Sequence, residues 1–137
     1  MSEAVKKDRP QFRNINFLKN LPFYYWPIGA YVSIGHRISG FLLAALLPFI
    51  LYLLEKSLTS EISFAHFQGI ASHWFVKLII LALVWSYLHH FCAGIRHLLM
   101  DLHIGLTKEG TGRTAIVVLA ISLSLTLLVA LKLFGVF

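Results

Sequence analysis

The sequence predicts an all-α integral membrane domain that contributes three transmembrane helices to a larger bundle. Of its 137 residues, 58% are hydrophobic and only 13% are charged, and the mean hydropathy is +0.75. A soluble domain of this size needs far more polar surface, because folding cannot hide every side chain. Apolar stretches without formal charge also recur three times, each close to the length of a membrane span. We therefore expect residues 1–137 to form one membrane-anchor domain.

Each apolar stretch predicts one helix. The first covers 31–54, about 36 Å at the helical rise, which is enough to cross the hydrocarbon core. Pro48 lies inside it and predicts a kink, because proline frees a backbone carbonyl that neighbouring helices must satisfy. The second helix is expected over 75–98 and the third over 114–134.

The two connections differ in character. The first is moderately polar, with a short surface helix expected near 64–69. The second, 102–113, contains three glycines and predicts a loop. Gly105 and Gly110 have the spacing of a phosphate-binding loop, but Thr111 stands where that motif requires lysine. Phosphate binding of that type is therefore excluded.

Basic residues predict the orientation. Those of the N-terminal segment 1–28 are Lys6, Lys7, Arg9, Arg13 and Lys19. Lys108 and Arg113 lie in the second connection, whereas the first connection and the tail are poor in basic residues. Under the positive-inside rule the N-terminus is cytoplasmic and the C-terminus periplasmic. The segment has no apolar core and is not acid-poor, so neither a signal nor a transit peptide is expected, which favours a bacterial inner membrane. The net charge of +6 does not indicate nucleic acid, because no binding motif accompanies it.

Two polar clusters interrupt the first and second helices. Ser33, His36, Arg37 and Gly40 follow the spacing i, i+3, i+4, i+7, which places them on one helical face. Polar groups inside a membrane helix are costly, so by default they indicate a functional site.

The second cluster forms a stripe of its own, made of His90, Gly94, His97 and Asp101. Its neighbour His89 is offset by about 100° and is expected to face elsewhere, as is Arg96. Since the two helices run in opposite directions, the charge rule brings both clusters to the same depth near the inner face.

Three interpretations of the clusters are open. A neutral imidazole such as His90 binds haem iron well, and Gly94 one turn away leaves room for a flat macrocycle. Arg37 and His36 are suited to pair with the anionic propionates. Alternatively, Arg37 and Ser33 are suited to donate hydrogen bonds to a quinone carbonyl in an apolar slot. The third interpretation is plain packing, but four polar groups at one depth favour a site.

Other polar residues carry weaker signals. Asp101 is expected to support the site or to pair with His97 or Arg96. Cys92, the one cysteine, is expected to pack in the interior. The histidines without an assigned role are His66, His73, His89 and His103.

The two clusters, taken together, resemble the cytochrome b subunit of succinate dehydrogenase, the larger of its two membrane anchors, over the whole chain. The motifs are the basic N-terminus with Lys6-Lys7 and Arg9-Pro10, the block Ser33-Ile34-x-His36-Arg37-x-Ser39-Gly40, and the block His90-x3-Gly94-Ile95-Arg96-His97-x3-Asp101. Their order in a three-span chain is specific. One departure is that many members carry Ser-Pro-His-Leu after Arg-Pro, where this chain has Phe23-Tyr24-Tyr25-Trp26-Pro27.

The resemblance implies a single haem b with His90 as an axial ligand to its iron. It also implies that His36 and Arg37 lie near the propionates, and that Ser33 and Arg37 contact ubiquinone. The supporting residues of the second block are Gly94, His97 and Asp101. The other axial histidine is implied to come from a second small membrane anchor, beside an iron–sulfur subunit and a flavoprotein subunit.

No catalytic residue is expected in this chain, because it has neither a flavin motif nor a cysteine set for iron–sulfur clusters. It is expected to act as a subunit of the dehydrogenase complex that helps to form the quinone site. The alternatives are an anchor of a fumarate reductase that uses a low-potential quinone, a non-haem three-helix membrane scaffold, and a proton-relay protein.

Overall fold

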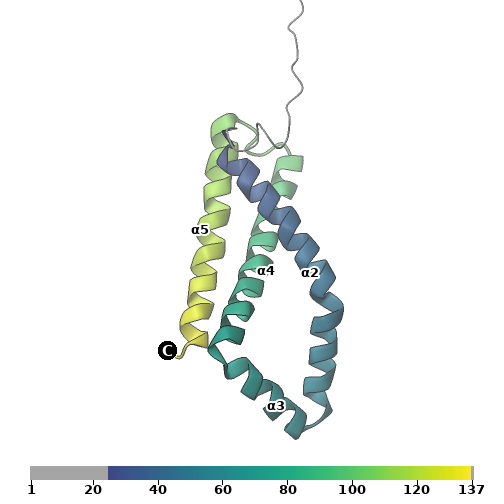
Figure 1. Cartoon of the computed structure of the whole chain (residues 1–137). Coiled ribbons are helices and arrows are strands. Elements are labelled where there is room, and N and C mark those ends of the chain that lie inside the picture. The colour runs from purple at the N-terminus through teal and green to yellow at the C-terminus, as the bar shows by residue number, and fades with distance from the viewer. Residues whose placement is uncertain (1–24, 137) are drawn as a thin grey trace, which may run out of the picture.

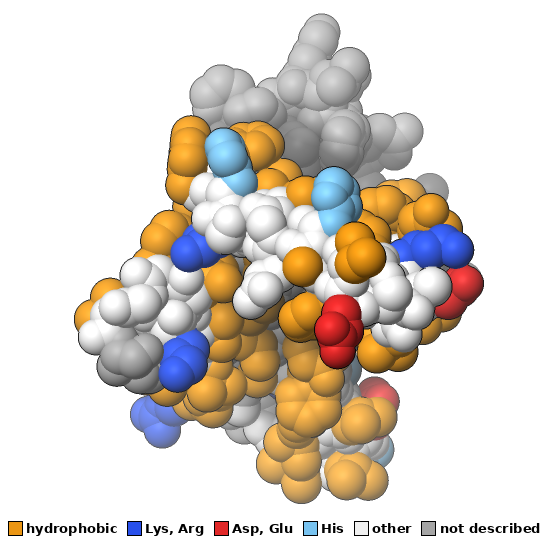
Figure 2. Space-filling view, turned by 90° about the horizontal axis from the view of Figure 1, so that it is seen from below, with side chains coloured by type: hydrophobic (Ala, Val, Ile, Leu, Met, Phe, Trp, Pro, Cys, Tyr) orange, Lys and Arg blue, Asp and Glu red, His pale blue; other side chains and the backbone are white. Residues whose placement is uncertain are grey.

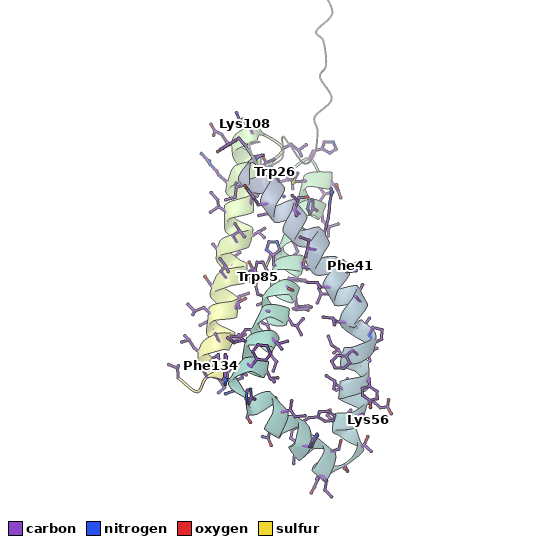
Figure 3. All side chains as sticks on the ribbon, viewed as in Figure 1. Trp26, Phe41, Lys56, Trp85, Lys108 and Phe134 are labelled. Carbon is purple, nitrogen blue, oxygen red and sulfur yellow. The ribbon has the colours of Figure 1, made fainter. Side chains whose placement is uncertain are left out.

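The computed structural model describes residues 25–136, and this part of the chain is built from helices and short connections. The helices are α2 (Ile28–Thr59), α3 (Glu61–Ser72), α4 (Trp74–Asp101) and α5 (Lys108–Leu133). α4 lies between α2 and α5, and α3 joins the ends of α2 and α4 that are distant from Trp26 (Figure 1; Figure 3). The basic arm Lys6–Lys19 lies outside the described residues.

The three long helices are each apolar and long enough to cross a membrane, which confirms the predicted all-α membrane fold. Their large apolar side chains mostly point outward, as the 74% exposure of Phe41 illustrates. Viewed from the α3 end, apolar side chains cover much of the visible flanks (Figure 2). These flanks are suited to contact lipid or other membrane helices. α2 bends in the half that contains Pro48 (Figure 1).

The predicted loop over 102–113 is wrong in its second half, because α5 already begins at Lys108. Thr107 caps this helix, its Oγ1 accepting a hydrogen bond from the Gly110 amide at 3.0 Å. A Cβ at Gly110 would lie 2.8 Å from the Gly105 carbonyl oxygen. The glycine therefore serves a close approach inside the first helical turn rather than marking a loop.

His103 ends α4 in a strained conformation, with φ at 62°. Its amide donates to the Met100 carbonyl at 2.9 Å, and the Ile104 amide donates to the Leu99 carbonyl at 3.0 Å. This is the Schellman pattern, in which the left-handed position is usually glycine. His103 thus has a structural role at the helix end.

The interior is small and unusually polar. The buried residues of the described part are Val32, Ser39, Ser86, His89, Ala93, Arg96, Ala115, Val118 and Ser122. More of them are polar than apolar, and none is a large aliphatic side chain. Small and polar residues at helix contacts are typical of membrane bundles, where close backbone approach replaces the hydrophobic driving force.

A close contact between α2 and α4 joins Gly35 to His89. The His89 ring is only 1% exposed, and its Nε2 lies 3.4 Å from the Val32 carbonyl oxygen. A Cβ on Gly35 would lie 2.7 Å from that same nitrogen. The absence of a side chain at Gly35 therefore sets how closely the two helices approach.

We predict that Gly35→Ala destabilises the protein by about 1–3 kcal/mol, the cost of overpacking a tight contact. The His89 ring cannot withdraw easily, because it is almost fully buried at the contact between the two helices. The measurement is the thermal midpoint of the purified protein in detergent. Gly69→Ala is the matched control, since an added Cβ there meets open space within α3. Equal midpoints for the two variants would contradict the prediction.

Candidate functional site

Three imidazole rings from α2 and α4 meet at one depth. The rings of His36 and His90 stack with centroids 4.2 Å apart and planes 7° from parallel. The ring of His97 lies 5.0 Å from His36 at an angle of 45°. These contacts confirm the predicted common depth of the two clusters.

His90 is held by a hydrogen bond to the backbone of α2. Its Nδ1 lies 3.0 Å from the His36 carbonyl oxygen and 3.3 Å from the Ser39 hydroxyl. A carbonyl only accepts, so Nδ1 carries the proton and donates, which leaves the Nε2 lone pair available. Within residues 25–136 the hydrogen bonds of this ring are made at Nδ1.

Glycine provides the space for His90, but the glycine responsible lies on α2. A Cβ on Gly40 would come within 2.7 Å of the His90 Cε1. Gly94, which we expected to face a macrocycle, instead faces the His36 ring, with Nε2 3.5 Å from a Cβ placed there. The reason is that His36 reaches across to α4 and covers this stretch of its backbone.

The buried stripe of each helix lies about one residue before the predicted stripe. On α4 the buried residues are Ser86, His89, Ala93 and Arg96. On α2 they are Val32 and Ser39. The predicted stripes are less buried and lie beside the helix contact instead of inside it. This leaves the cluster of His36, His90 and His97 at the rim, where a ligand or a partner chain can reach it.

His89 does not face away from α2, which corrects the sequence-based expectation. Successive helical residues point about 100° apart, so His89 and His90 both contact α2, on two sides of the crossing. His89 Nδ1 is buried without a hydrogen-bond partner in the described part, and its ring lies 5.2 Å from that of Trp85. Its position is therefore determined by packing inside the bundle.

Ser33 lines a cavity of about 400 Å³ near the Trp26 end of the bundle. The lining residues are Pro27, Ile28, Gly29, Ala30, Ser33, Arg96, His97, Met100, Lys108, Thr111 and Gly112. Figure 3 shows Trp26 and Lys108 at this end. Arg37, one turn beyond Ser33, is exposed and does not line the cavity. The cavity has the size of a small-molecule site and contains groups that donate hydrogen bonds.

Arg96 binds α5 and not Asp101. Its Nε donates to the Thr114 hydroxyl at 3.0 Å, and Nη2 donates to the Thr111 carbonyl at 3.3 Å. Asp101 is exposed at the end of α4, and the ion pairs of the described part do not include it. The alternative of a pair between Asp101 and Arg96 or His97 is therefore wrong.

Two contributors were missed from the sequence. Ser39 is buried and bonds to His90 Nδ1, and Gly35 accommodates His89. Gly35 and Ser39 follow Val32 at i+3 and i+7, a helical stripe that could have been noticed in the sequence.

Cys92 packs against the small core, as expected. His73 caps α4 by accepting from the Phe75 amide.

Within residues 25–136, no three histidine, cysteine or acidic side chains are arranged to hold a metal ion. A metal ion at His90 would therefore have to arrive with further ligands of its own or from another chain. A planar prosthetic group meets this requirement, because it supplies most of the coordination itself.

Comparisons with known proteins show the family to which the chain belongs. Residues 8–129 match the family model described as succinate dehydrogenase/fumarate reductase transmembrane subunit. A succinate dehydrogenase cytochrome b556 subunit of Coxiella burnetii is 42% identical over 85 residues, which cover 61% of this chain and 67% of the relative. The subunit of that name from Paracoccus denitrificans is 30% identical over 115 residues, covering 84% of this chain and 88% of the relative.

A third relative, the cytochrome b556 subunit of Rickettsia prowazekii, is 29% identical over 109 residues, 80% of this chain and 85% of the relative. The family match spans most of the chain and includes both polar clusters, all of α2 and α4, and α5 as far as residue 129. The chain belongs to the family of succinate dehydrogenase/fumarate reductase transmembrane subunits.

Proposed function

We propose that this chain binds one haem b through His90 and helps to form the site where ubiquinone is reduced. The observation that carries the proposal is the hydrogen bond from His90 Nδ1 to the His36 carbonyl. Metal-bound histidines typically donate their other ring nitrogen to a carbonyl or carboxylate, which fixes the tautomer and the ring orientation. The relatives are named cytochrome b556 subunits, which favours haem over the scaffold and proton-relay alternatives.

The residues present fit the group. His90 is half-buried beside the helix crossing, and the stacked His36 ring restrains its rotation. Haem b, when bound, supplies a one-electron carrier at this depth. Arg37 directly follows His36 and is exposed. Its guanidinium provides a fixed positive charge for the propionates. Gly94, His97 and Asp101 are proposed only as supporting residues.

A second axial ligand from this chain is unfavourable. His90 and His97 lie on one stripe of α4, so they cannot approach one iron from opposite faces. His89 is enclosed by α2. We therefore propose that a second small membrane anchor supplies the other histidine. Such a partner would cover part of the exposed apolar surface of the described helices.

The quinone site is proposed at the cavity that Ser33 lines. The Ser33 hydroxyl inside the cavity and the Arg37 guanidinium, which is exposed one turn along α2 and outside the lining, are donors that would stabilise the charge growing on the ubiquinone carbonyl during reduction. His97 lines the same cavity and contacts His36, which stacks on His90. A continuous row of rings thus joins the proposed haem ligand to the quinone cavity.

We place the dehydrogenase chemistry in other subunits, because this sequence has neither a flavin motif nor a cysteine set for iron–sulfur clusters. Electrons from succinate would come from a flavoprotein subunit through an iron–sulfur subunit docked at the Trp26 end. The relatives carry the name succinate dehydrogenase, which favours succinate oxidation over fumarate reduction. We propose the bacterial inner membrane as the location, with the Trp26 end on the cytoplasmic side, where Lys108 and Arg113 lie.

The haem proposal is tested by His90→Ala. We expect loss of the low-spin bis-histidine absorbance spectrum of the reduced complex, because one axial ligand is removed. His89→Ala is the matched control and should keep a bis-histidine spectrum, although its thermal midpoint falls. A wild-type spectrum from His90→Ala would refute the assignment.

Gly40→Ala tests the same ligand without removing it. The added Cβ would meet the His90 ring at 2.7 Å, so we expect the ring to turn and its bond to the His36 carbonyl to weaken. The expected results are a shifted absorbance band and a changed midpoint potential of the haem, since outer hydrogen bonds tune both. Gly69→Ala, where a Cβ meets open space within α3, should change neither. A spectrum and potential identical to those of wild type would argue against His90 as the ligand.

The quinone proposal is tested by Arg37→Ala. We expect succinate–ubiquinone reductase activity to fall by about 10²-fold, the usual cost of removing a charge-stabilising donor. Succinate oxidation with an artificial dye acceptor should stay unchanged, because it bypasses the membrane site. Lys56→Ala, at the opposite end of the bundle (Figure 3), is the control. Undiminished ubiquinone reduction by Arg37→Ala would contradict the proposal.

A further inference from the structure

Arg96 is a buried cation at the wall of the cavity that Ser33 lines. It lies on α4, is 5% exposed, and belongs to the lining of that cavity. Its Nη2 donates to the Thr111 carbonyl at 3.3 Å, and a Cβ placed on Gly29 would lie 3.3 Å from the same nitrogen. Thr111 and Gly29 line the cavity as well. The guanidinium therefore lies where the first turns of α2 and α5 meet α4.

Part of this guanidinium is not used by the contacts between the helices. An arginine carries five N–H donors, and within residues 25–136 the bonds of Arg96 are made by Nε, to the Thr114 hydroxyl, and by Nη2. Nη1 makes none of these bonds and is not among the fully buried side-chain atoms that lack a partner. It therefore reaches open space. The apolar groove between α4 and α5, which Arg96 also lines, exposes almost no polar surface, so that space is the cavity that Ser33 lines.

The charge of Arg96 is not neutralised in the part of the chain that the structure describes. The ion pairs there do not include it, and the described lining of the cavity contains no carboxylate. A buried positive charge in a membrane helix is costly unless an opposite charge compensates it, so by default it indicates a functional site. It is also preorganised to stabilise negative charge that develops in the cavity. Arg37, in contrast, is exposed and lies outside the lining.

We propose that the Arg96 guanidinium donates a hydrogen bond to one carbonyl oxygen of the quinone, beside the Ser33 hydroxyl. Gly29 and Ser33 are spaced i, i+4, so they lie on one face of α2, one turn of about 5.4 Å apart. Because the guanidinium lies against Gly29, the two donors are separated by a similar distance. A carbonyl oxygen accepts two bonds of about 2.9 Å each. Both donors can therefore reach the same oxygen.

The inference rests on the proposed quinone site and adds to it a charged donor from α4. Reduction to the quinol takes two electrons, which the proposed iron–sulfur subunit supplies, and two protons, which come from the aqueous side. Arg96 stays protonated throughout and transfers neither. Its role is to stabilise the negative charge that grows on the oxygen. A buried cation does so more strongly than an exposed one, because the surroundings screen it less.

A purely structural role is the alternative, because the bonds of Arg96 join α4 to α5. Thr114→Val separates the two roles. The Thr114 hydroxyl accepts from Nε, and Thr114 lines the apolar groove but not the cavity. Valine therefore removes one bond between the helices, keeps the shape of the side chain, and leaves the guanidinium in place.

The first measurement is the steady-state reduction of a short-chain ubiquinone by the complete complex. We expect Arg96→Gln to lower kcat by about 10²–10³-fold, the cost of removing one charge-stabilising donor, with a smaller change in KM. Arg96→Lys keeps the charge and should recover part of the loss. Thr114→Val should keep kcat within about twofold, as should Lys132→Gln, which removes a charge at the opposite end of α5. Succinate oxidation with a dye acceptor should be unchanged in all four variants.

Infrared spectra test the bond itself. Ubiquinone carrying ¹³C at each of its two ring carbonyls in turn is bound to the oxidised complex, and the isotope difference isolates each carbonyl stretch. A carbonyl that accepts from a cation stretches at lower frequency, so Arg96→Gln should raise the frequency of one of the two. Thr114→Val should leave both at their wild-type values. Gly29→Ala keeps the arginine but crowds Nη2, so it should give a smaller rise, and it serves as the test if Arg96→Gln does not assemble.

Three results would overturn the inference. If Ser33→Ala lowers kcat while Arg96→Gln changes neither kcat nor the carbonyl frequencies, the quinone site stands without Arg96. If Thr114→Val lowers kcat as far as Arg96→Gln does, and the frequencies stay unchanged in both, Arg96 only holds α5 in place. If neither Ser33→Ala nor Arg96→Gln has an effect, quinone does not bind in this cavity, and the proposed site fails together with the inference.

Discussion

The close crossing of α2 and α4 is the contact on which the rest of the structure depends. Between two apolar helices in lipid there is no hydrophobic driving force, so backbone proximity and hydrogen bonds decide the packing. Gly35 and Gly40 create the space, and His89 and His90 fill it on two sides of the crossing. The distance between the helices is thereby set to that at which His90 reaches the carbonyl of His36.

The depth of the candidate site could be predicted from the sequence, whereas the rotation of its helices could not. The depth of each polar cluster follows from where its helix begins and from the opposite directions of the two helices. Both can be inferred from the charge pattern. Rotation depends on which flank of α4 receives α5, and no local pattern contains that information. The predicted stripes were therefore offset by about one residue, which moved His89 into the interior and Ser33 to a cavity at the side.

Glycine was the least predictable residue type, because its three structural uses look the same in a sequence. Gly110 permits a close approach inside a helix that was expected to be a loop. Gly94, expected to leave room for a macrocycle, faces the His36 ring, and Gly40 accommodates the His90 ring. In each case the neighbour across the contact decides the role. That neighbour is distant in sequence, so spacing alone does not identify it.

The hydrogen bond of His90 has a consequence for how this protein can change over time. The acceptor belongs to the peptide backbone, and no substitution at position 36 removes a peptide carbonyl. The side chain of His36 can therefore vary while the proton stays on Nδ1 of His90. Natural variation that keeps His90 can reach this bond by adding a side chain at Gly40, which would displace the ring, or by moving one helix relative to the other. The position of the proton on Nδ1 of His90 is thus less sensitive to substitution at position 36 than a bond to the side chain of that residue would be.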